Sequence, residues 1–320
     1  MANIDIFNGD ADGICALVQL RNAQPKSSRL VTGVKRDIAL VAQVEYQADD
    51  EVTVLDISFD KNREGVESAL ESGARVLYFD HHFAGDVPES KNLEICINTT
   101  SDVCTSVLVN EHLGGAFRAW AVVGAFGDNL NKTAEGVAKP LNLSDGELEQ
   151  LKALGTYINY NGYGSKLEDL HFEPAALYSK LVEFANPLDF IAEDKTTFDQ
   201  LERGYYLDMS AARAITPKIE MDSVAVFVFP DEAWARRVSG VYSNDLVNEH
   251  PNRAHAVLTE RSDGSYLVSL RAPLNNKTGA DEICRQFPTG GGRTAAAGIN
   301  ELPADLLESF IDVFSNFYRL

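Results

Sequence analysis

The sequence predicts an α/β protein with a doubly wound, mainly parallel sheet and a second, smaller α+β domain. Three observations predict this architecture. Short apolar runs alternate with helical patterns along the first part of the chain, as in successive strand–helix–strand units. Several of these runs end in aspartate or histidine, as at the ligand-binding edge of a parallel sheet. After about residue 222 the pattern changes to strands joined by a hairpin signal.

The length and charge of the chain limit its organisation and its partners. It has 320 residues, 45% of them apolar, which is enough for two domains of ordinary size. We expect a first domain over residues 1–200, a linker over 201–222 and a second domain over 223–320. The formal net charge of −20 repels phosphate backbones, so long double-stranded nucleic acid is not an expected partner. Short nucleotides stay open, because metal ions and arginines can dominate the local field.

The sequence carries no targeting pattern. It enters a predicted strand at once, without the basic and apolar segments of a secretion signal. No stretch approaches the roughly 18 apolar residues of a membrane span. The four cysteines form no C-x-x-C pair and are expected to be reduced. We therefore expect a cytoplasmic protein with no membrane contact, and a homodimer stays open.

The first predicted strand, residues 4–7, leads through a glycine-containing turn into a helix over 14–20. Asp10 and Asp12 stand two residues apart in this turn and can point into one site, where the glycines let the backbone approach a ligand. Aspartate at such a turn is also a common helix cap. One of the two carboxylates can be only a cap, but we do not expect both to be caps.

The next strands end in further polar side chains. A short strand near 30–32 precedes an apolar strand over 52–58 that carries Asp56 near its end. A helix over 61–70 returns to a strand over 75–79, which runs into Asp80, His81 and His82. An aspartate with two imidazoles suits a divalent ion such as Mn²⁺. The alternative is a histidine pair that caps the strand without an ion.

The rest of the first domain is predicted to be largely helical. A strand over 93–97 is followed by helices over 104–113 and 116–123, and the segment after the second helix carries Asp128. A helix over 143–160 opens with a capping-box pattern at Ser144 and Glu147. Helical periodicity then continues, with breaks, to about residue 211.

The second domain contains a candidate anion site. We expect a strand over 223–229, a hairpin of strands over 254–260 and 265–270, and helices over 281–287 and 303–318. Consecutive N–H groups of Gly290, Gly291 and Gly292 can form an anion-binding nest. Arg271 and Arg293 can each hold a phosphate through two hydrogen bonds. A flexible loop is the alternative for the glycine run.

The first domain gathers acidic and imidazole side chains at predicted element ends. Five carboxylates and two imidazoles in one crevice would repel one another unless cations neutralise them. Oxygen-rich ligation with some histidine suits Mn²⁺, with Mg²⁺ as the alternative. Two ions about 3.5–4 Å apart would stabilise both the attacking and the leaving oxygen of an in-line phosphoryl displacement. The group comprises Asp10, Asp12, Asp56, Asp80, His81, His82 and Asp128.

Four short segments stand in a recognisable order: Gly-Asp-Ala-Asp-Gly at 9–13, Val-Leu-Asp-Ile-Ser at 54–58, Phe-Asp-His-His at 79–82 and Gly-Asp-Asn at 127–129. In that order the chain resembles the DHH phosphoesterase family. Val-Ser-Leu-Arg at 268–271 and the glycine run resemble the family's C-terminal substrate-binding domain. The resemblance covers nearly the whole chain. It implies hydrolysis of phosphoester bonds in small nucleotides, short oligonucleotides, cyclic dinucleotides or single strands, with two Mn²⁺ ions.

The resemblance also implies roles for the metal-ligating residues. Asp10 would bind the first ion and Asp12 the second, while Asp56 would bridge the two. His81 and Asp128 would complete the second site.

Other residues would act on the substrate. His82 would contact the scissile phosphate or the leaving group, and Asp80 would orient the histidines. A hydroxide activated by the two ions would be the nucleophile. Arg271, residues 290–292 and Arg293 would hold a terminal phosphate of the substrate.

The sequence departs from the family pattern at three positions. Ile6 stands where many members have a histidine ligand of the first ion. Asn8 stands where members similar to single-strand exonucleases have aspartate, and its carbonyl oxygen is a weaker ligand. Arg293 stands where many members have histidine; it keeps the positive charge but cannot do acid–base work.

These observations favour a Mn²⁺-dependent phosphodiesterase that acts on short linear nucleotides, such as 5′-phosphorylated dinucleotides, in a cleft between two domains. The alternatives are a single-strand-specific exonuclease, an adenosine bisphosphate phosphatase and a polyphosphatase. An exonuclease would need a basic groove with aromatic stacking platforms, which the sequence does not show. A non-catalytic nucleotide-binding protein that has lost one ion is a further alternative, because of Ile6 and Asn8.

Overall fold

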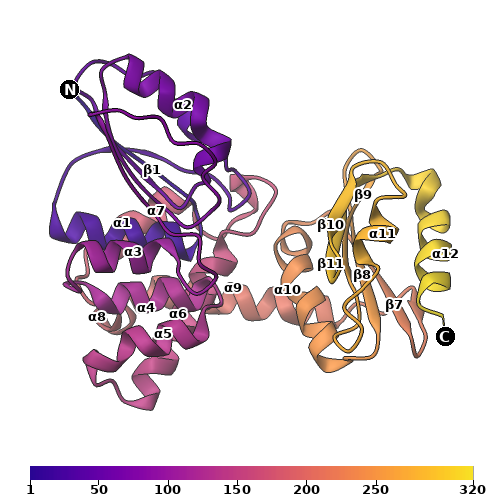
Figure 1. The fold of residues 1–320 in the computed structure, drawn as a ribbon. Helices are drawn as coiled ribbons and strands as arrows, with labels where there is room; N and C mark the ends of the chain where they lie inside the picture. The colour runs from indigo at the N-terminus through magenta and orange to yellow at the C-terminus, as the bar shows by residue number, and fades with distance from the viewer. Residues whose placement is uncertain (320) are drawn as a thin grey trace. The chain divides into compact units, whose positions relative to one another are not determined.

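The computed structural model describes residues 1–319 and divides the chain into two compact units, Met1–Tyr205 and Tyr206–Leu320 (Figure 1). Leu320, the last residue of the predicted second domain, lies outside the described residues. The division falls within a helix, α9 (Lys195–Arg213), so the predicted linker begins inside a regular element. None of the helices described within residues 1–319 is long and apolar enough to cross a membrane.

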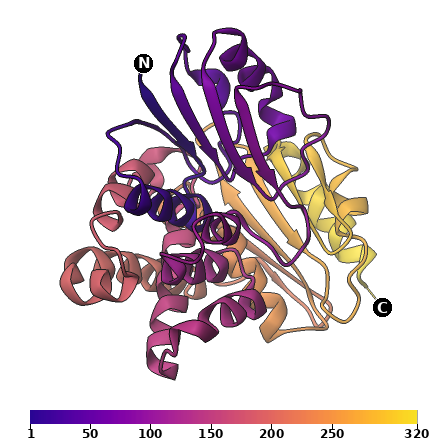
Figure 2. The ribbon, with the colours of Figure 1, turned by 60° about the vertical axis from the view of Figure 1, so that its left-hand side comes forward.

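The first unit contains a five-stranded parallel sheet in the order β2-β1-β3-β4-β5, which confirms the predicted doubly wound fold. Figure 2 shows its strands, indigo to purple, side by side. The strands are β1 (Asn3–Phe7), β2 (Arg29–Val31), β3 (Glu51–Leu55), β4 (Arg75–Asp80) and β5 (Leu93–Ile97).

Both faces of this sheet are covered. Phe7, Leu55 and Phe79 belong to the core shared with α1, α3 and α4, whereas the preceding residues of the same strands belong to the core shared with α2. This alternation follows from the two-residue period of a strand. The covering helices are α1 (Ala11–Ala23), α2 (Phe59–Glu71), α3 (Thr105–His112) and α4 (Arg118–Gly127).

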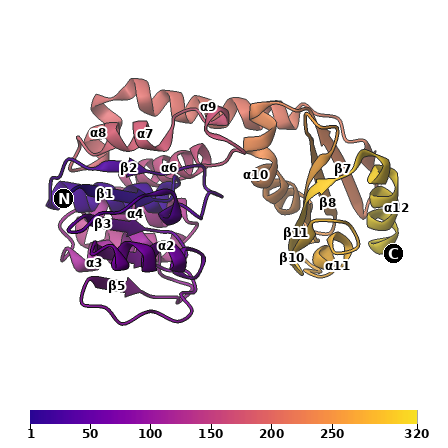
Figure 3. The ribbon, with the colours of Figure 1, turned by 90° about the horizontal axis from the view of Figure 1, so that it is seen from above.

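Further helices complete the first unit. The capping box predicted at the start of α6 is present, since the Ser144 side chain accepts from the Glu147 N–H and Glu147 accepts from the Ser144 N–H. In Figure 3, α7, α8 and α9 lie on one side of the unit. The remaining helices are α5 (Asn131–Ala138), α6 (Asp145–Asn161), α7 (Pro174–Leu181) and α8 (Pro187–Glu193).

The second unit is built on a six-stranded mixed sheet in the order β10-β11-β9-β8-β7-β6. The predicted hairpin is present as β8 and β9. One face packs against α12, whose Phe310 and Phe314 belong to the same buried apolar cluster as Val226 of β7 and Ala256 of β8. The strands are β6 (Ile219–Glu220), β7 (Val224–Phe229), β8 (Ala254–Glu260), β9 (Tyr266–Arg271), β10 (Gly290–Arg293) and β11 (Ala296–Leu302), and the helices are α10 (Ala233–Glu249), α11 (Ala280–Cys284) and α12 (Leu307–Phe317).

Two features of this unit differ from the sequence-based expectation. The expectation contained no helix between 229 and 254, but α10 connects β7 to β8, which pair in parallel and therefore need a crossover. The glycine run at 290–292 is not a loop: it forms β10, the edge strand paired with β11. An edge strand leaves alternate N–H groups unpaired, which differs from the consecutive N–H groups of a nest.

Candidate metal centre

The site lies at the carboxyl ends of adjacent strands in the first unit. β1, β3 and β4 are neighbours in the sheet, and the pairing continues past their ends: the Asn8 N–H donates to Leu55 O at 3.2 Å, and the Asp56 N–H donates to Phe79 O at 3.0 Å. Asp56 has a φ of +59°, a left-handed conformation that aspartate tolerates better than most residues. The parallel topology therefore brings segments far apart in sequence to one edge.

Asp56, His81 and His82 form the candidate metal cluster. Each offers one ligand atom, and the three atoms lie within 4.8 Å of one another. The Nε2 of His81 is 3.4 Å from Oδ1 of Asp56. Carboxylate and imidazole together suit a divalent ion such as Mn²⁺.

The neighbours of the histidines select the ring nitrogen that is free to ligate. The Nδ1 of His81 lies 3.1 Å from Val103 O, a group that can only accept, so Nδ1 donates and Nε2 faces Asp56. The Nδ1 of His82 lies 2.7 Å from Oδ1 of Asp80. A second hydrogen-bond partner on the non-ligating nitrogen is the usual arrangement for metal-binding histidine.

Asp80 is fully buried and contacts both histidines. Its Oδ1 also accepts the His81 N–H at 2.8 Å, and its Oδ2 accepts the Phe59 N–H at the start of α2 at 3.3 Å. The hydrogen bond with Asp80 is the main reason that the pKa of His82 is raised above its ordinary value. The contacts support the orienting role that the resemblance implies for Asp80.

Asp10 and Asp12 both accept backbone N–H groups at the starts of helices. Asp10 is the N-cap of α1, and its Oδ1 accepts the N–H groups of Asp12 and Gly13 at 3.0 and 3.1 Å. The Asp12 carboxylate accepts the N–H groups of Thr105 and Ser106, both at 2.7 Å, at the start of α3. The contacts of Asp12 could not be predicted from the sequence, because its two partners are 93 and 94 residues away.

Lys35 is a residue of this site that the sequence reasoning did not identify. Its Nζ lies 2.6 Å from Oδ2 of Asp10 and 2.9 Å from Oδ1 of Asn159. Burial acts to raise the pKa of Asp10, but the Lys35 ammonium and its hydrogen bond outweigh burial and lower it. Lys35 stands between predicted elements, in no motif, so no local signal marked it.

The carboxylates on the other side of the site are crowded. Burial, together with the charges of Asp10 and Asp12, raises the pKa of Asp56. Burial and the same two carboxylates raise the pKa of Asp128, the C-cap of α4, to about 6. Both shifts reflect negative charge that a bound cation would relieve.

The residues fit an ion at one position better than at the other. Asp56 and His81 offer a carboxylate oxygen and an imidazole nitrogen to a divalent ion. Asp128 is close enough to His81 to interact with it electrostatically. Near Asp10, the side chain of Ile6 is fully buried and has no ligand atom. Asn8 has a buried Oδ1 without a hydrogen-bond partner among residues 1–319, while its Nδ2 donates to Lys35 O at 3.3 Å.

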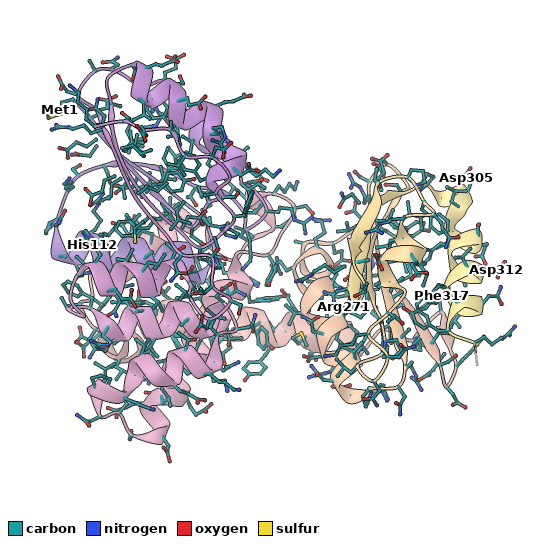
Figure 4. All side chains as sticks on the ribbon, in the orientation of Figure 1. Met1, His112, Arg271, Asp305, Asp312 and Phe317 are labelled. Atoms are coloured by element: carbon teal, nitrogen blue, oxygen red, sulfur yellow. The ribbon has the colours of Figure 1, made fainter. Side chains whose placement is uncertain are left out.

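The second unit brings its two predicted phosphate-binding arginines onto one face of its sheet. Ala296 is paired with Arg293 on one side and with Arg271 on the other, so the three side chains share a face. Arg271, labelled in Figure 4, donates to Asn244 on α10 at 2.8 Å through Nε. Arg293 is exposed.

The sequence matches no protein-family model, and no curated protein matches it. Solved structures resemble it in fold. An exonuclease RecJ bound to manganese aligns over 99% of this chain and 90% of its own, with 16% identity and a TM-score of 0.64. A pGpG-specific phosphodiesterase, PggH from Vibrio cholerae, aligns over 99% of both chains, with 14% identity and a TM-score of 0.57. A DHH-domain protein described as a member of the s1p family of ribosomal proteins aligns over 99% of this chain and 86% of its own, with 11% identity and a TM-score of 0.64. The two-domain α/β fold that the resemblance implied is therefore confirmed.

Proposed function

We propose that this protein is a divalent-metal-dependent phosphodiesterase that hydrolyses short linear nucleotides, such as 5′-phosphorylated dinucleotides. The observation that carries the proposal is the cluster of Asp56, His81 and His82 at the carboxyl edge of a parallel sheet, with both histidines fixed through Nδ1. The similar fold of a manganese-bound exonuclease and of a pGpG-specific phosphodiesterase supports it. Mn²⁺ is the ion that the donor set favours, and Mg²⁺ is the alternative.

The residues of the cluster have separable roles in this proposal. Asp56, His81 and Asp128 hold an ion, which when bound supplies positive charge at the phosphoryl group and an activated water near neutral pH. His82 contacts the scissile phosphate or the leaving group, and its raised pKa favours the protonated ring that such a contact needs. Asp80 holds both histidines in place. The resemblance adds Asp12 to the ligands of this ion and implies another ion at Asp10, bridged by Asp56, with Asn8 as a weaker ligand.

The substrate is proposed to be short. Arg271 and Arg293, on one face of the second unit, are the candidate ligands of a terminal phosphate, with the edge strand β10 beside them. The net charge of −20 disfavours long phosphate backbones. In the first unit, Phe83 directly follows the two histidines and its side chain is 73% exposed, which makes it a candidate surface for stacking a base. The four cysteines are free thiols, which supports a proposed location in the reducing cytoplasm.

The test is hydrolysis of a 5′-phosphorylated dinucleotide with Mn²⁺, alongside a long single strand. Asp128→Ala removes a proposed ligand, and Asp86→Ala, an exposed aspartate in the loop after β4, is the matched control. Rapid dinucleotide turnover that only Asp128→Ala abolishes supports the proposal. Cleavage of the long strand alone would identify a single-strand exonuclease instead.

Two outcomes lead to the remaining alternatives. Hydrolysis of adenosine bisphosphate or polyphosphate, without cleavage of either nucleotide chain, would identify a phosphatase at the same site. Absence of all these activities, with one bound ion or none, would favour a non-catalytic nucleotide-binding protein. Both results would contradict the proposed phosphodiesterase.

A further inference from the structure

We propose that the ammonium group of Lys35 takes the place of the first metal ion, so that this centre holds one divalent ion and one built-in cation. The inference rests on the proposed function for the ion at Asp56 and His81. It departs from the two-ion arrangement that the resemblance implies. The residues around Asp10 carry the argument.

Lys35 is held against Asp10 by its backbone as well as by its side chain. Its N–H donates to Gly162 O at 2.8 Å, and its carbonyl accepts from Asn8 Nδ2 at 3.3 Å. Nζ then reaches Oδ2 of Asp10 at 2.6 Å and Oδ1 of Asn159 at 2.9 Å. The Tyr163 ring lies beside it, 5.7 Å from Nζ to the centroid. These contacts from separate segments fix the ammonium group at the site.

The Asp10 carboxylate has little left to offer an ion. Its Oδ2 is occupied by the ammonium of Lys35, and its Oδ1 accepts the N–H groups of Asp12 and Gly13. A divalent ion on Oδ2 would compete with the ammonium for the same oxygen and would be repelled by it. The ammonium group of Lys35 already neutralises the negative charge of Asp10 that an ion would otherwise neutralise.

The other candidate ligands on this side are also weak. Ile6 stands where a histidine ligand is expected and has no donor atom. The buried Oδ1 of Asn8 has no partner among residues 1–319, but it is a single neutral oxygen. An amide oxygen alone cannot replace an imidazole and a free carboxylate.

The opposite side of the centre keeps the features of an ion site. The Nε2 of His81 faces Oδ1 of Asp56 at 3.4 Å. The Thr105 hydroxyl donates to Oδ1 of Asp56 at 3.1 Å. Asp128 is crowded by the negative charges of Asp12 and Asp10. One ion at this position and one lysine at the other give the cluster its two cations.

The test is the number and magnetic coupling of Mn²⁺ ions bound to the full chain. Equilibrium dialysis with metal analysis gives the number, and electron paramagnetic resonance distinguishes an isolated Mn²⁺ from a spin-coupled pair. We expect one Mn²⁺ per wild-type chain, with the spectrum of an isolated ion. In Lys35→Met, which keeps the length of the side chain but not its charge, we expect a second, weaker Mn²⁺ and the appearance of coupling.

The matched control is Lys26→Met, because Lys26 also pairs with a carboxylate of the first unit, Glu51, at 2.7 Å. It should bind one ion, as the wild type does. Two coupled ions in the wild type would overturn the inference, even when the dinucleotide is hydrolysed. One ion in Lys35→Met and also in Lys35→Gln would overturn the replacement of an ion by lysine.

These outcomes separate the inference from the proposed function. One ion without hydrolysis of the dinucleotide or the long strand supports the role of Lys35 and contradicts the phosphodiesterase. Two ions with hydrolysis contradict the role of Lys35 and support the phosphodiesterase. A wild-type chain that binds no ion contradicts both. Two ions in the wild type overturn the inference even where Lys35→Met fails to fold, and Lys35→Gln then tests the role of the lysine.

Discussion

The Nδ1 of His82 lies 2.7 Å from Oδ1 of Asp80, and the same buried oxygen accepts the backbone N–H of His81 at 2.8 Å. One carboxylate thus orients two consecutive histidines that leave β4 on the same edge of the sheet. The other oxygen of Asp80 accepts the N–H of Phe59, so the carboxylate is itself fixed by the start of α2. A substitution at Asp80 can therefore remove the charge of this side chain while keeping its size.

Asp80→Asn keeps the size of the side chain and removes its charge. Because the hydrogen bond with Asp80 and its charge raise the pKa of His82, we expect that pKa to fall towards its ordinary value. Mn²⁺ affinity should fall by roughly 10–100-fold, as for other residues that orient metal ligands. Histidine NMR titration and calorimetry measure the two effects. An unchanged His82 pKa would contradict the role of Asp80, and Asp86→Asn controls for loss of an exposed carboxylate.

His81→Ala removes the imidazole that faces Asp56. A ligand that binds only the folded state stabilises it by about 2.7 kcal/mol at a concentration of 100 times its Kd. We expect Mn²⁺ to stabilise the wild type on this scale, and a chelator to reverse the effect. In His81→Ala this stabilisation should be absent. His112→Ala, an exposed histidine on α3 labelled in Figure 4, should keep it. Thermal unfolding with and without Mn²⁺ provides the comparison.

Phe83→Ala tests whether the exposed ring beside His82 stacks on a base. Stacking of one base on an aromatic side chain contributes about 1–3 kcal/mol, which corresponds to a rise in KM of roughly 5- to 150-fold. We expect kcat and Mn²⁺ affinity to stay close to wild type, because Phe83 is not one of the proposed ion ligands. Val87→Ala, an exposed apolar residue in the same loop, is the control. A KM that changes equally in both variants would show a general effect of the loop.

Local patterns in the sequence predicted most elements of the fold and the residues at the strand ends. Short apolar runs predicted β1, β3 and β4, and the parallel topology then explains why Asp56 and His81 meet. The capping box of α6 could be predicted because both partners lie within three residues. All of these signals act over a few residues.

Long-range contacts account for what the sequence did not predict. Lys35 and Asn159 are 124 positions apart, and no pattern in either segment indicates their contact. The capping of α3 by Asp12 depends on how α1 and α3 pack, which follows only from the whole fold. The glycine run looked like a loop because pairing with β11, not its own composition, makes it a strand.

His255 gives the second unit a pH-dependent stability. Its side chain is fully buried on β8, and neither ring nitrogen has a hydrogen-bond partner among residues 1–319. Burial, with smaller contributions from the charges of Arg253 and His250, lowers its pKa to about 4. Between pH 4 and about 6.5 the unfolded chain therefore binds a proton that the folded chain does not. Stability is fully present above about pH 6.5 and is lost as the pH falls towards 4.

His255→Leu should remove most of this loss, which amounts to about 2–3 kcal/mol of unfolding free energy between pH 6.5 and 4. Trp234 is the one tryptophan of the second unit and lies 5.4 Å from Phe229 between ring centroids, so its fluorescence in a Trp120→Phe background reports on this unit. Urea unfolding at several pH values measures the effect. His250→Leu, at an exposed histidine, should keep most of the wild-type pH dependence, because burial lowers the pKa of His255 more than the charge of His250 does. The same pH dependence in His255→Leu would show that the carboxylates of the unit, and not the buried imidazole, cause the loss.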